Sequence, residues 1–265
     1  MTTQTAMNEK YDCQMALKMA VMLGVMLMEN GAEVYRVEES ILRVLRSYGI
    51  KRTDVYALPN IIIVTIETEE DISYTKTRRI YQNNPNFERV VRLNDLARRI
   101  STTPIPLCDA FRELKSIDRQ KYYPLLVDWV SYVLAAASFA MMIGGTVWDG
   151  AVAILCTFLG RLARVPMERY HANNFFLTVV ASYIHNVVAY AFAHAFVGLH
   201  VNTIITGSLM MLFPGVAFMT ALRDVIARDL NAGMFEAMEA VVVAGSIAIG
   251  SALAYATFPY IARVI

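Results

Sequence analysis

The residues best placed to do chemistry lie in one apolar segment, residues 201–222. Its first half carries four polar side chains: Asn202, Thr203, Thr206 and Ser208. At its centre Pro214 precedes Gly215, and because proline lacks an N–H and clashes with the preceding turn, a helix is predicted to kink or break there. A helix restarting at Gly215 presents free N–H groups and partial positive charge, which suit a substrate carboxylate. A packing kink explains the same pair, since both residues are common in membrane helices.

The preceding apolar segment, residues 173–197, has one polar face. Ser182, His185 and Asn186 are three or four residues apart, so this face must contact protein or water rather than lipid. A histidine titrates near neutral pH and suits proton relay, whereas hydrogen bonds between helices explain the same face. We therefore place His185 and Asn186 either on a substrate pathway or in a helix interface.

A carboxylate stands at the first predicted outer turn. Asp149 follows Gly144 and Gly145 and opens an apolar run. Aspartate is a favoured N-cap residue, and an ionisable group beside a membrane span is also a functional candidate. Asp149 is therefore predicted to cap a helix or to mark the entry of the pathway.

A charged stretch separates the last two apolar segments. Asp224 and Arg228 are one helical turn apart and are predicted to pair. Arg223 and Asp224 adjoin the apolar segment, and Glu236 and Glu239 share a face at the start of the next one. Asp224 is placed on the substrate pathway. Arg223, Glu236 and Glu239 either gate a cytoplasmic mouth or are charges on a solvated helix end.

The elements that position these residues follow from composition. Hydrophobic residues make up 56% of the 265-residue chain, above the usual share of a soluble domain. Residues 1–121 hold 18 of 24 Lys+Arg and 16 of 23 Asp+Glu, so charge is scarce beyond them. This excludes a disordered chain, a wholly soluble enzyme and a nucleic-acid binder with a strong basic field. Five membrane spans are predicted: residues 123–143, 146–162, 173–197, 201–222 and 235–258.

Residues 1–121 are predicted to form an α+β domain. The apolar run 15–28 is too short for a span and is interpreted as a buried helix, in this domain or on the membrane part. The other predicted helices are 32–48, 94–101 and 107–117. The predicted strands are 54–58, 61–67, 72–81 and 87–93, with turns at Pro59-Asn60 and Glu69-Glu70-Asp71. The fold class is thus a cytoplasmic α+β domain (1–121) followed by a polytopic α-helical domain of five transmembrane helices (122–265).

The loop charges predict the orientation, because cytoplasmic loops are enriched in Lys and Arg. Two loops carry the basic residues Arg161, Arg164, Arg169, Arg223 and Arg228. The loops at 144–150 and 198–202 carry none. The N-terminal domain is therefore predicted inside the cell and the C-terminus outside.

Motifs for other chemistry are missing from the sequence. There is no nucleophile elbow, phosphate loop, H-E-x-x-H or kinase signature, which argues against a hydrolase or an ATP-driven pump. Cys13, Cys108 and Cys156 are too far apart for a zinc or disulfide pattern. We expect no enzyme activity, no cofactor, no metal and no nucleic-acid partner, and energy drawn from an ion gradient.

Two stretches resemble one family. Residues 30–39, NGAEVYRVEE, resemble the segment that opens the threonine/serine exporter family. Phe213-Pro214-Gly215, with Arg223-Asp224, Asn231-Ala232-Gly233 and Glu239-Ala240 downstream, is similar to a second run of that family. The Gly144-Gly145 turn before Asp149 also agrees. The resemblance covers both parts of the chain in the right order.

The resemblance implies a subunit of a secondary exporter in a bacterial inner membrane. Full-length members have two hydrophobic halves on one chain, whereas this chain has one. It therefore resembles the larger subunit of the split succinate exporters. A small hydrophobic membrane subunit, the lipid bilayer and a small carboxylate would be its partners, and the family leaves room for a higher oligomer. The substrate would be a dicarboxylate such as succinate, or threonine/serine.

Four residues of the N-terminal motif have two readings. Glu33, Tyr35, Arg36 and Glu38 could cap, pair and pack within the domain, or contact substrate leaving the cytosol, since arginine suits carboxylates. An alternative for the whole chain is a membrane-anchored sensor or binding domain without transport. Glu33, Arg36 and the strands would then hold the ligand.

Overall fold

The computed structural model describes residues 3–68, 71–81, 85–103, 105–120, 123–170 and 172–262, with side chains from residue 12 onward. The chain divides into two compact units. Unit 1 comprises Met1–Tyr122 with Asp229–Ala232, and unit 2 comprises Tyr123–Arg228 with Gly233–Ile265. Residues 121 and 122, where the sequence places the domain boundary, lie outside the described residues, as do Glu69 and Glu70 of a predicted turn.

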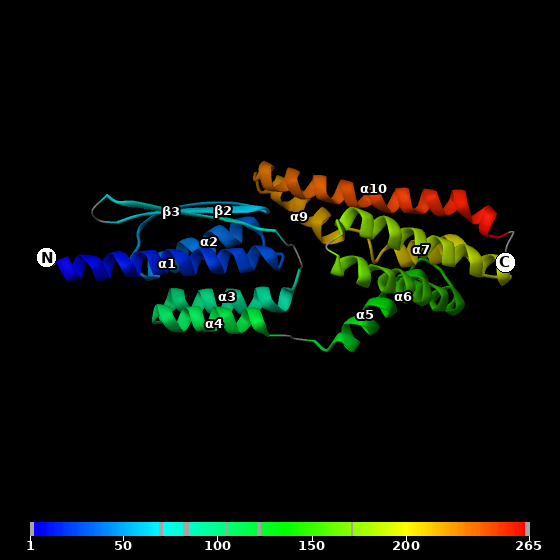
Figure 1. Cartoon of the computed structure of the whole chain (residues 1–265), viewed down its shortest axis with the longest axis horizontal. Helices are drawn as coiled ribbons and strands as arrows, with labels where there is room; N and C mark the ends of the chain where they lie inside the picture. Colours follow the sequence, from blue (N-terminus) through cyan, green and yellow to red (C-terminus); the bar gives the residue numbers. More distant parts are fainter. Residues whose placement is uncertain are drawn as a thin grey trace. The chain divides into compact units, whose positions relative to one another are not determined.

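Unit 1 combines four helices with a small antiparallel sheet (Figure 1). The three strands pair in the order β1-β2-β3, with Val55 opposite Val64 and Val64 opposite Lys76. The elements are α1 (Thr3–Glu29), α2 (Val34–Ser47), β1 (Arg52–Leu58), β2 (Ile61–Glu67), β3 (Ser73–Arg79), α3 (Phe87–Thr102) and α4 (Leu107–Arg119).

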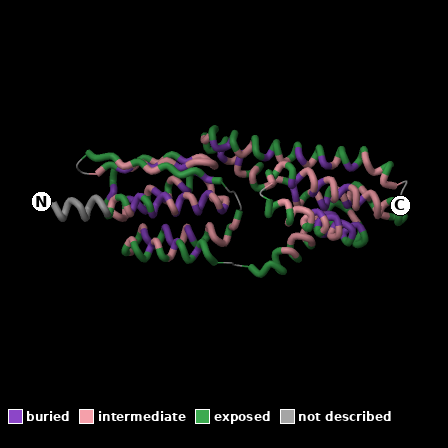
Figure 2. The backbone as a smooth tube through the Cα atoms, in the orientation of Figure 1, coloured by how far each residue is buried: buried purple, intermediate pink, exposed green. Residues whose placement is uncertain are grey.

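Helix α1 is the centre of unit 1. It contacts α2, α3, α4, β2 and β3, and buried positions recur along it (Figure 2). Its side chains Met19, Leu23 and Leu27 are fully buried. The apolar run that resembles a short membrane span is therefore a core helix of this unit. Its C-terminus closes at Gly31, where φ is 85° and the Ala32 N–H donates to the Leu27 carbonyl at 3.0 Å.

The predicted strand at 87–93 is wrong. These residues form the first half of α3, whose buried residues Leu93, Leu96 and Ile100 follow helical spacing. The Asn86 side chain accepts from the Arg89 N–H at 3.1 Å and so caps the helix start. Valine and phenylalanine favour strands in isolation, but the cap and the buried stripe decide the local structure.

Unit 2 is helical: α5 (Leu125–Met142), α6 (Val147–Arg169), α7 (Asn174–Ala195), α8 (Val201–Leu209), α9 (Gly215–Ile226) and α10 (Leu230–Ile261). Within the described residues four helices are long and apolar enough to cross a membrane, namely α5, α6, α7 and α10. The chain is therefore a membrane protein, while the count of five spans stays a prediction. Helix α6 runs past the predicted end at 162 to Arg169.

The segment predicted as the fourth span is not one helix. It divides into α8 of nine residues and α9 of 12 residues, with 210–214 between them. The predicted break at Pro214 and Gly215 is thus present, and it is wider than a kink. Neither half reaches the length of about 20 residues that a span needs alone.

Helix α8 is held by close contacts at glycines. A Cβ added at Gly207 would lie 2.7 Å from the Ala140 backbone nitrogen of α5. One added at Gly145 would lie 2.7 Å from Thr203 Cγ2 of α8. Helix α8 also packs against α6 and α7. Small residues at such crossings let helix backbones approach closely, as membrane helices require.

We expect Gly207→Ala to lower the melting temperature of the purified chain in detergent. The added methyl group collides with backbone rather than with a movable side chain, and overpacking of this kind costs about 1–3 kcal/mol. Gly245→Ala in α10 is the matched control, because no atom lies within 4 Å of its added Cβ. Equal melting temperatures for the two variants would contradict this packing.

Candidate functional site

The interruption between α8 and α9 is the centre of the candidate site. The Met211 N–H donates to the Ser208 carbonyl at 3.3 Å, and the Gly215 N–H donates to the Phe213 carbonyl at 2.8 Å. The first bond of α9 runs from the Phe218 N–H to the Pro214 carbonyl at 3.0 Å. The N–H groups of residues 216 and 217 precede that bond and have no partner within their own helix.

A side chain of α5 contacts this interruption. The Tyr132 hydroxyl donates to the Met211 carbonyl at 3.4 Å. Leu212 is buried, whereas Met210 and Phe213 are exposed. The segment between the two short helices is therefore anchored to α5 on one side and open on the other.

The polar residues of α8 do not act as one group. Asn202 and Thr206 are one helical turn apart and both are exposed. Ser208 is buried and donates to the Ile205 carbonyl of its own helix at 3.0 Å. Only Asn202 and Thr206 remain available to line an open route.

The polar face of α7 contacts two neighbours. The Ser182 hydroxyl donates to the Ile247 carbonyl of α10 at 2.8 Å, and Asn186 Nδ2 donates to the Ser251 hydroxyl at 2.9 Å. These bonds favour the reading of Asn186 as part of a helix interface. A Cβ added at Gly160 of α6 would lie 2.3 Å from His185 Nε2, so this imidazole fills the space above a glycine.

His185 is a buried titratable group beside α8. It is 1% exposed and lies within hydrogen-bonding reach of the Ser208 backbone. Its Nδ1 atom has no hydrogen-bond partner within the described part of the chain. A buried imidazole with one open nitrogen suits proton relay, and the reading made from the sequence stays a prediction.

Asp149 caps α6 together with Thr146. Thr146 is the N-cap residue of α6, and Asp149 is the third residue of the helix. The prediction that Asp149 itself is the N-cap residue is therefore wrong, but its side chain does take part in capping the helix. The wholly buried carboxylate accepts from the Thr146 N–H at 2.8 Å and from the His200 N–H at 2.8 Å. His200 Nδ1 lies 2.9 Å from the same carboxylate. Asp149 thereby joins the starts of α6 and α8.

His200 is a residue that the sequence argument missed. It is the N-cap residue of α8 and its ring is largely exposed. The sequence signal that could have identified it is its position in the second predicted outer loop, on the same side of the membrane as Asp149.

The predicted pair of Asp224 and Arg228 is wrong. Helix α9 ends at Ile226, and Arg228 adopts a left-handed φ of 70°, so the one-turn spacing is lost. Asp224 is instead 2% exposed, with Arg223 Nη2 at 3.7 Å from its carboxylate. A buried carboxylate beside one arginine is a costly group that marks a functional candidate in a membrane segment.

The two glutamates at the start of α10 separate. Glu236 is half-buried, lies against the Thr220 side chain and is close enough to Asp224 and Arg223 for their charges to act on it. Glu239 is exposed. The structure thus groups Arg223, Asp224 and Glu236 between α9 and α10, with the exposed Glu239 close enough for its charge to act on Glu236.

The N-terminal motif residues lie in unit 1 and contact one another. Arg36 Nε is 2.7 Å from the Glu33 carboxylate and donates to the Tyr35 hydroxyl at 3.0 Å. Glu38 Oε1 accepts from the Ala57 N–H of β1 at 2.8 Å. Because β1 is an edge strand, Glu38 satisfies a backbone group that the sheet leaves open. These contacts favour the structural reading of the motif.

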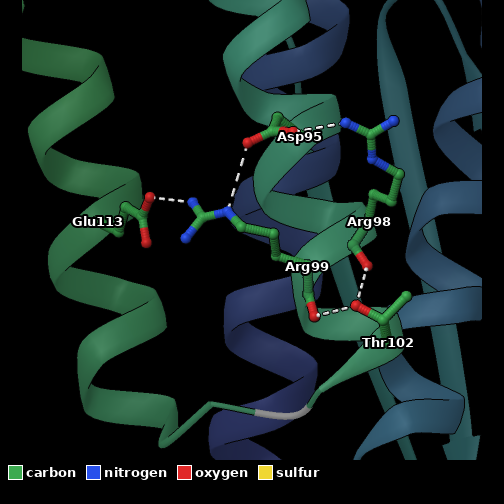
Figure 3. A network of polar contacts seen from close by, with 5 residues as sticks. All are labelled: Asp95, Arg98, Arg99, Thr102 and Glu113. Atoms are coloured by element: carbon green, nitrogen blue, oxygen red, sulfur yellow. Dashed lines mark hydrogen bonds and ion pairs between the residues drawn. The ribbon is translucent and has the colours of Figure 1, made fainter.

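A groove of about 1000 Å³ lies between α2, α3 and α4. Its arginines are paired with carboxylates: Arg99 of α3 contacts both Asp95 of its own helix and Glu113 of α4 (Figure 3). Arg98 pairs with Asp95 at 2.7 Å. The charges that line the groove are therefore compensated, and the alternative function as a sensor stays a prediction.

These observations define a class of protein. Long apolar helices, an apolar segment divided at its centre and buried polar groups among these helices are the architecture of a polytopic membrane transporter. The family model described as "Putative threonine/serine exporter" matches residues 18–258. The match covers about nine-tenths of the chain, so the chain belongs to the threonine/serine exporter family, as the resemblance indicated. No curated protein and no solved structure matches it.

Glu38 gives a prediction about pH. Burial raises the pKa of the Glu38 carboxyl from 4.5, although the Ala57 N–H acts in the opposite direction. The folded state therefore binds more protons than the unfolded state between the two pKa values, and stability falls as pH rises through that window. Glu38→Gln keeps the acceptor without the charge. We expect its melting temperature, relative to the wild type, to rise from pH 4.5 upward and then to level off.

Glu38→Ala is the control for the hydrogen bond. It removes the acceptor of the Ala57 N–H and is expected to be less stable than Glu38→Gln by about 1 kcal/mol at every pH. If the difference in melting temperature between the wild type and Glu38→Gln is the same at every pH, burial of this carboxyl has no thermodynamic effect.

Proposed function

We propose that this chain is one subunit of a secondary exporter of small carboxylates. The substrate is a dicarboxylate such as succinate, or threonine/serine, and a small hydrophobic membrane subunit completes the exporter. It resides in a bacterial inner membrane with its N-terminus in the cytoplasm and its C-terminus outside. Family membership supports export, and the distribution of Lys and Arg among the loops supports the orientation.

The observation that carries the proposal is the division of an apolar segment at Pro214. Irregular backbone at membrane depth is tolerated only where it is enclosed by protein or lines a water-filled cavity. Helix α9 begins there with free N–H groups, and its N-terminus favours negative charge. A substrate carboxylate at this point would accept hydrogen bonds from those N–H groups.

The remaining polar residues fit a route through this point. Asn202 and Thr206 line its outer half, and His185 lies beside it as a proton-relay group. Arg223, Asp224, Glu236 and Glu239 form the inner mouth. The buried Asp224 supports coupling to an ion gradient. An unpaired carboxylate anion is costly in a low-dielectric site, so this side chain favours the binding of a proton or a cation.

The partner subunit is inferred from the resemblance to the split exporters, and the exposed apolar surface of α10 supports it. Large apolar side chains are exposed along α10, among them Val241, Ile249 and Leu253. Lipid and the second subunit together would cover this surface in the membrane.

The test is export from cells that lack this chain and then regain it together with its partner. Pro214→Ala restores a helix through the division and Asp224→Asn removes the buried charge. We expect Pro214→Ala to lower export by roughly two- to thirtyfold, which corresponds to about 0.5–2 kcal/mol for an anion at a helix N-terminus, and Asp224→Asn to lower export as well.

Pro166→Ala is the matched control, because Pro166 lies inside the continuous helix α6 and divides nothing. It is expected to export at the wild-type rate. Normal export by both Pro214→Ala and Asp224→Asn would show that the site is assigned to the wrong residues.

A further inference from the structure

Arg161 of α6 lies in an aromatic cage. Its guanidinium carbon is 4.8 Å from the centre of the Trp129 ring and 4.6 Å from the centre of the Tyr132 ring. Its Nη2 atom pairs with the Asp128 carboxylate. The two rings and the carboxylate all come from α5, so this helix surrounds the charged end of a side chain from its neighbour.

Arg161 lies well inside α6 rather than in a loop. The helix begins at Val147 and continues to Arg169, so Arg161 is 14 residues from its first end. Its partner Asp128 is in the first turn of α5, so the ion pair lies close to one end of that helix. A cation within a membrane helix, held by two aromatic rings and a carboxylate, is a functional candidate. Its side chain is only 22% exposed.

The cage adjoins the interruption between α8 and α9. Tyr132, whose ring lies under Arg161, donates its hydroxyl to the Met211 carbonyl at 3.4 Å. A single side chain thus links the guanidinium to the divided segment. Arg164, one turn further along α6, also acts on Tyr132 through its charge, but its guanidinium contacts Glu168 at 3.3 Å and Asn174 at 3.3 Å.

We propose that Arg161 binds the carboxylate of the transported substrate and that Asp128 is the internal carboxylate that the substrate displaces. This rests on the proposed function and names a binding residue for it. The planar guanidinium presents paired donors that match a carboxylate, and the rings of Trp129 and Tyr132 hold that plane in place. Asp128 is 55% exposed and has room to turn away when a second carboxylate arrives.

The alternative is a plain ion pair that joins α5 to α6. The two roles predict opposite changes in substrate binding when the Asp128 carboxylate is removed. If the pair only joins helices, loss of either partner weakens the protein and its function together. If Asp128 competes with substrate, its removal strengthens substrate binding while removal of Arg161 weakens it.

The experiment measures binding to the purified full chain by thermal shift and calorimetry, with succinate and L-threonine as probes. For the bound probe, Arg161→Gln is expected to raise the dissociation constant by roughly tenfold or more. Asp128→Asn is expected to lower it by about two- to fivefold, the range of a partly exposed ion pair. Arg169→Gln, which removes an exposed arginine at the end of the same helix, is expected to change nothing.

A dissociation constant that rises in both Asp128→Asn and Arg161→Gln, or that stays unchanged in Arg161→Gln, would overturn the assignment. So would wild-type protein that binds neither probe. If Arg161→Gln fails to fold, the direction of change in Asp128→Asn decides. Export by the chain with its partner separates the two proposals: binding without export refutes the exporter, and export unaffected by these variants refutes the role of Arg161.

Discussion

The structure of unit 2 depends on one constraint, that backbone N–H and C=O groups within a bilayer must find partners other than lipid. The N–H groups of residues 210–213 still bond to carbonyls three or four residues earlier, and the regular pattern is lost at Pro214, which has no N–H, and at Gly215, whose N–H bonds to the Phe213 carbonyl. Close contacts at Gly207 and Gly145 seat α8 against α5, and Tyr132 supplies a donor to the Met211 carbonyl. Helix α5 therefore anchors the division on one side, while Met210 and Phe213 are exposed on the other.

Many groups that appear catalytic or ligand-binding in the sequence have structural partners. Asp149 is saturated by Thr146 and His200, and Asn186 bonds to Ser251. Glu38 satisfies an edge strand of unit 1. These residues shape the fold. Two other charged groups are partly buried within unit 2, namely the cluster of Arg223, Asp224 and Glu236 and the pair of Arg161 with Asp128, and these are the candidates for a transport role.

Much of this arrangement follows from the sequence, because its signals are local. Helical periodicity predicted α2 and α4, strand composition predicted β1 to β3, and Pro214 predicted the division of an apolar segment. The strand expected at 87–93 failed because its residue types favour strands while the Asn86 cap and a distant core decide for helix. The sequence placed Arg161 among the basic residues of a loop. The residues that surround its guanidinium come from α5, 29 to 33 residues earlier, and no local pattern predicts that contact.

The most direct test of the central claim is the access of water to the divided segment in intact membranes. Single cysteines are introduced as Phe213→Cys, Val216→Cys and Ile249→Cys after Cys13, Cys108 and Cys156 have been replaced by serine, and a water-soluble maleimide is applied. Ile249 is exposed in mid-helix on α10 and serves as the lipid-facing control. The account predicts reaction at positions 213 and 216 and none at 249. Positions 213 and 216 as unreactive as 249 would contradict it.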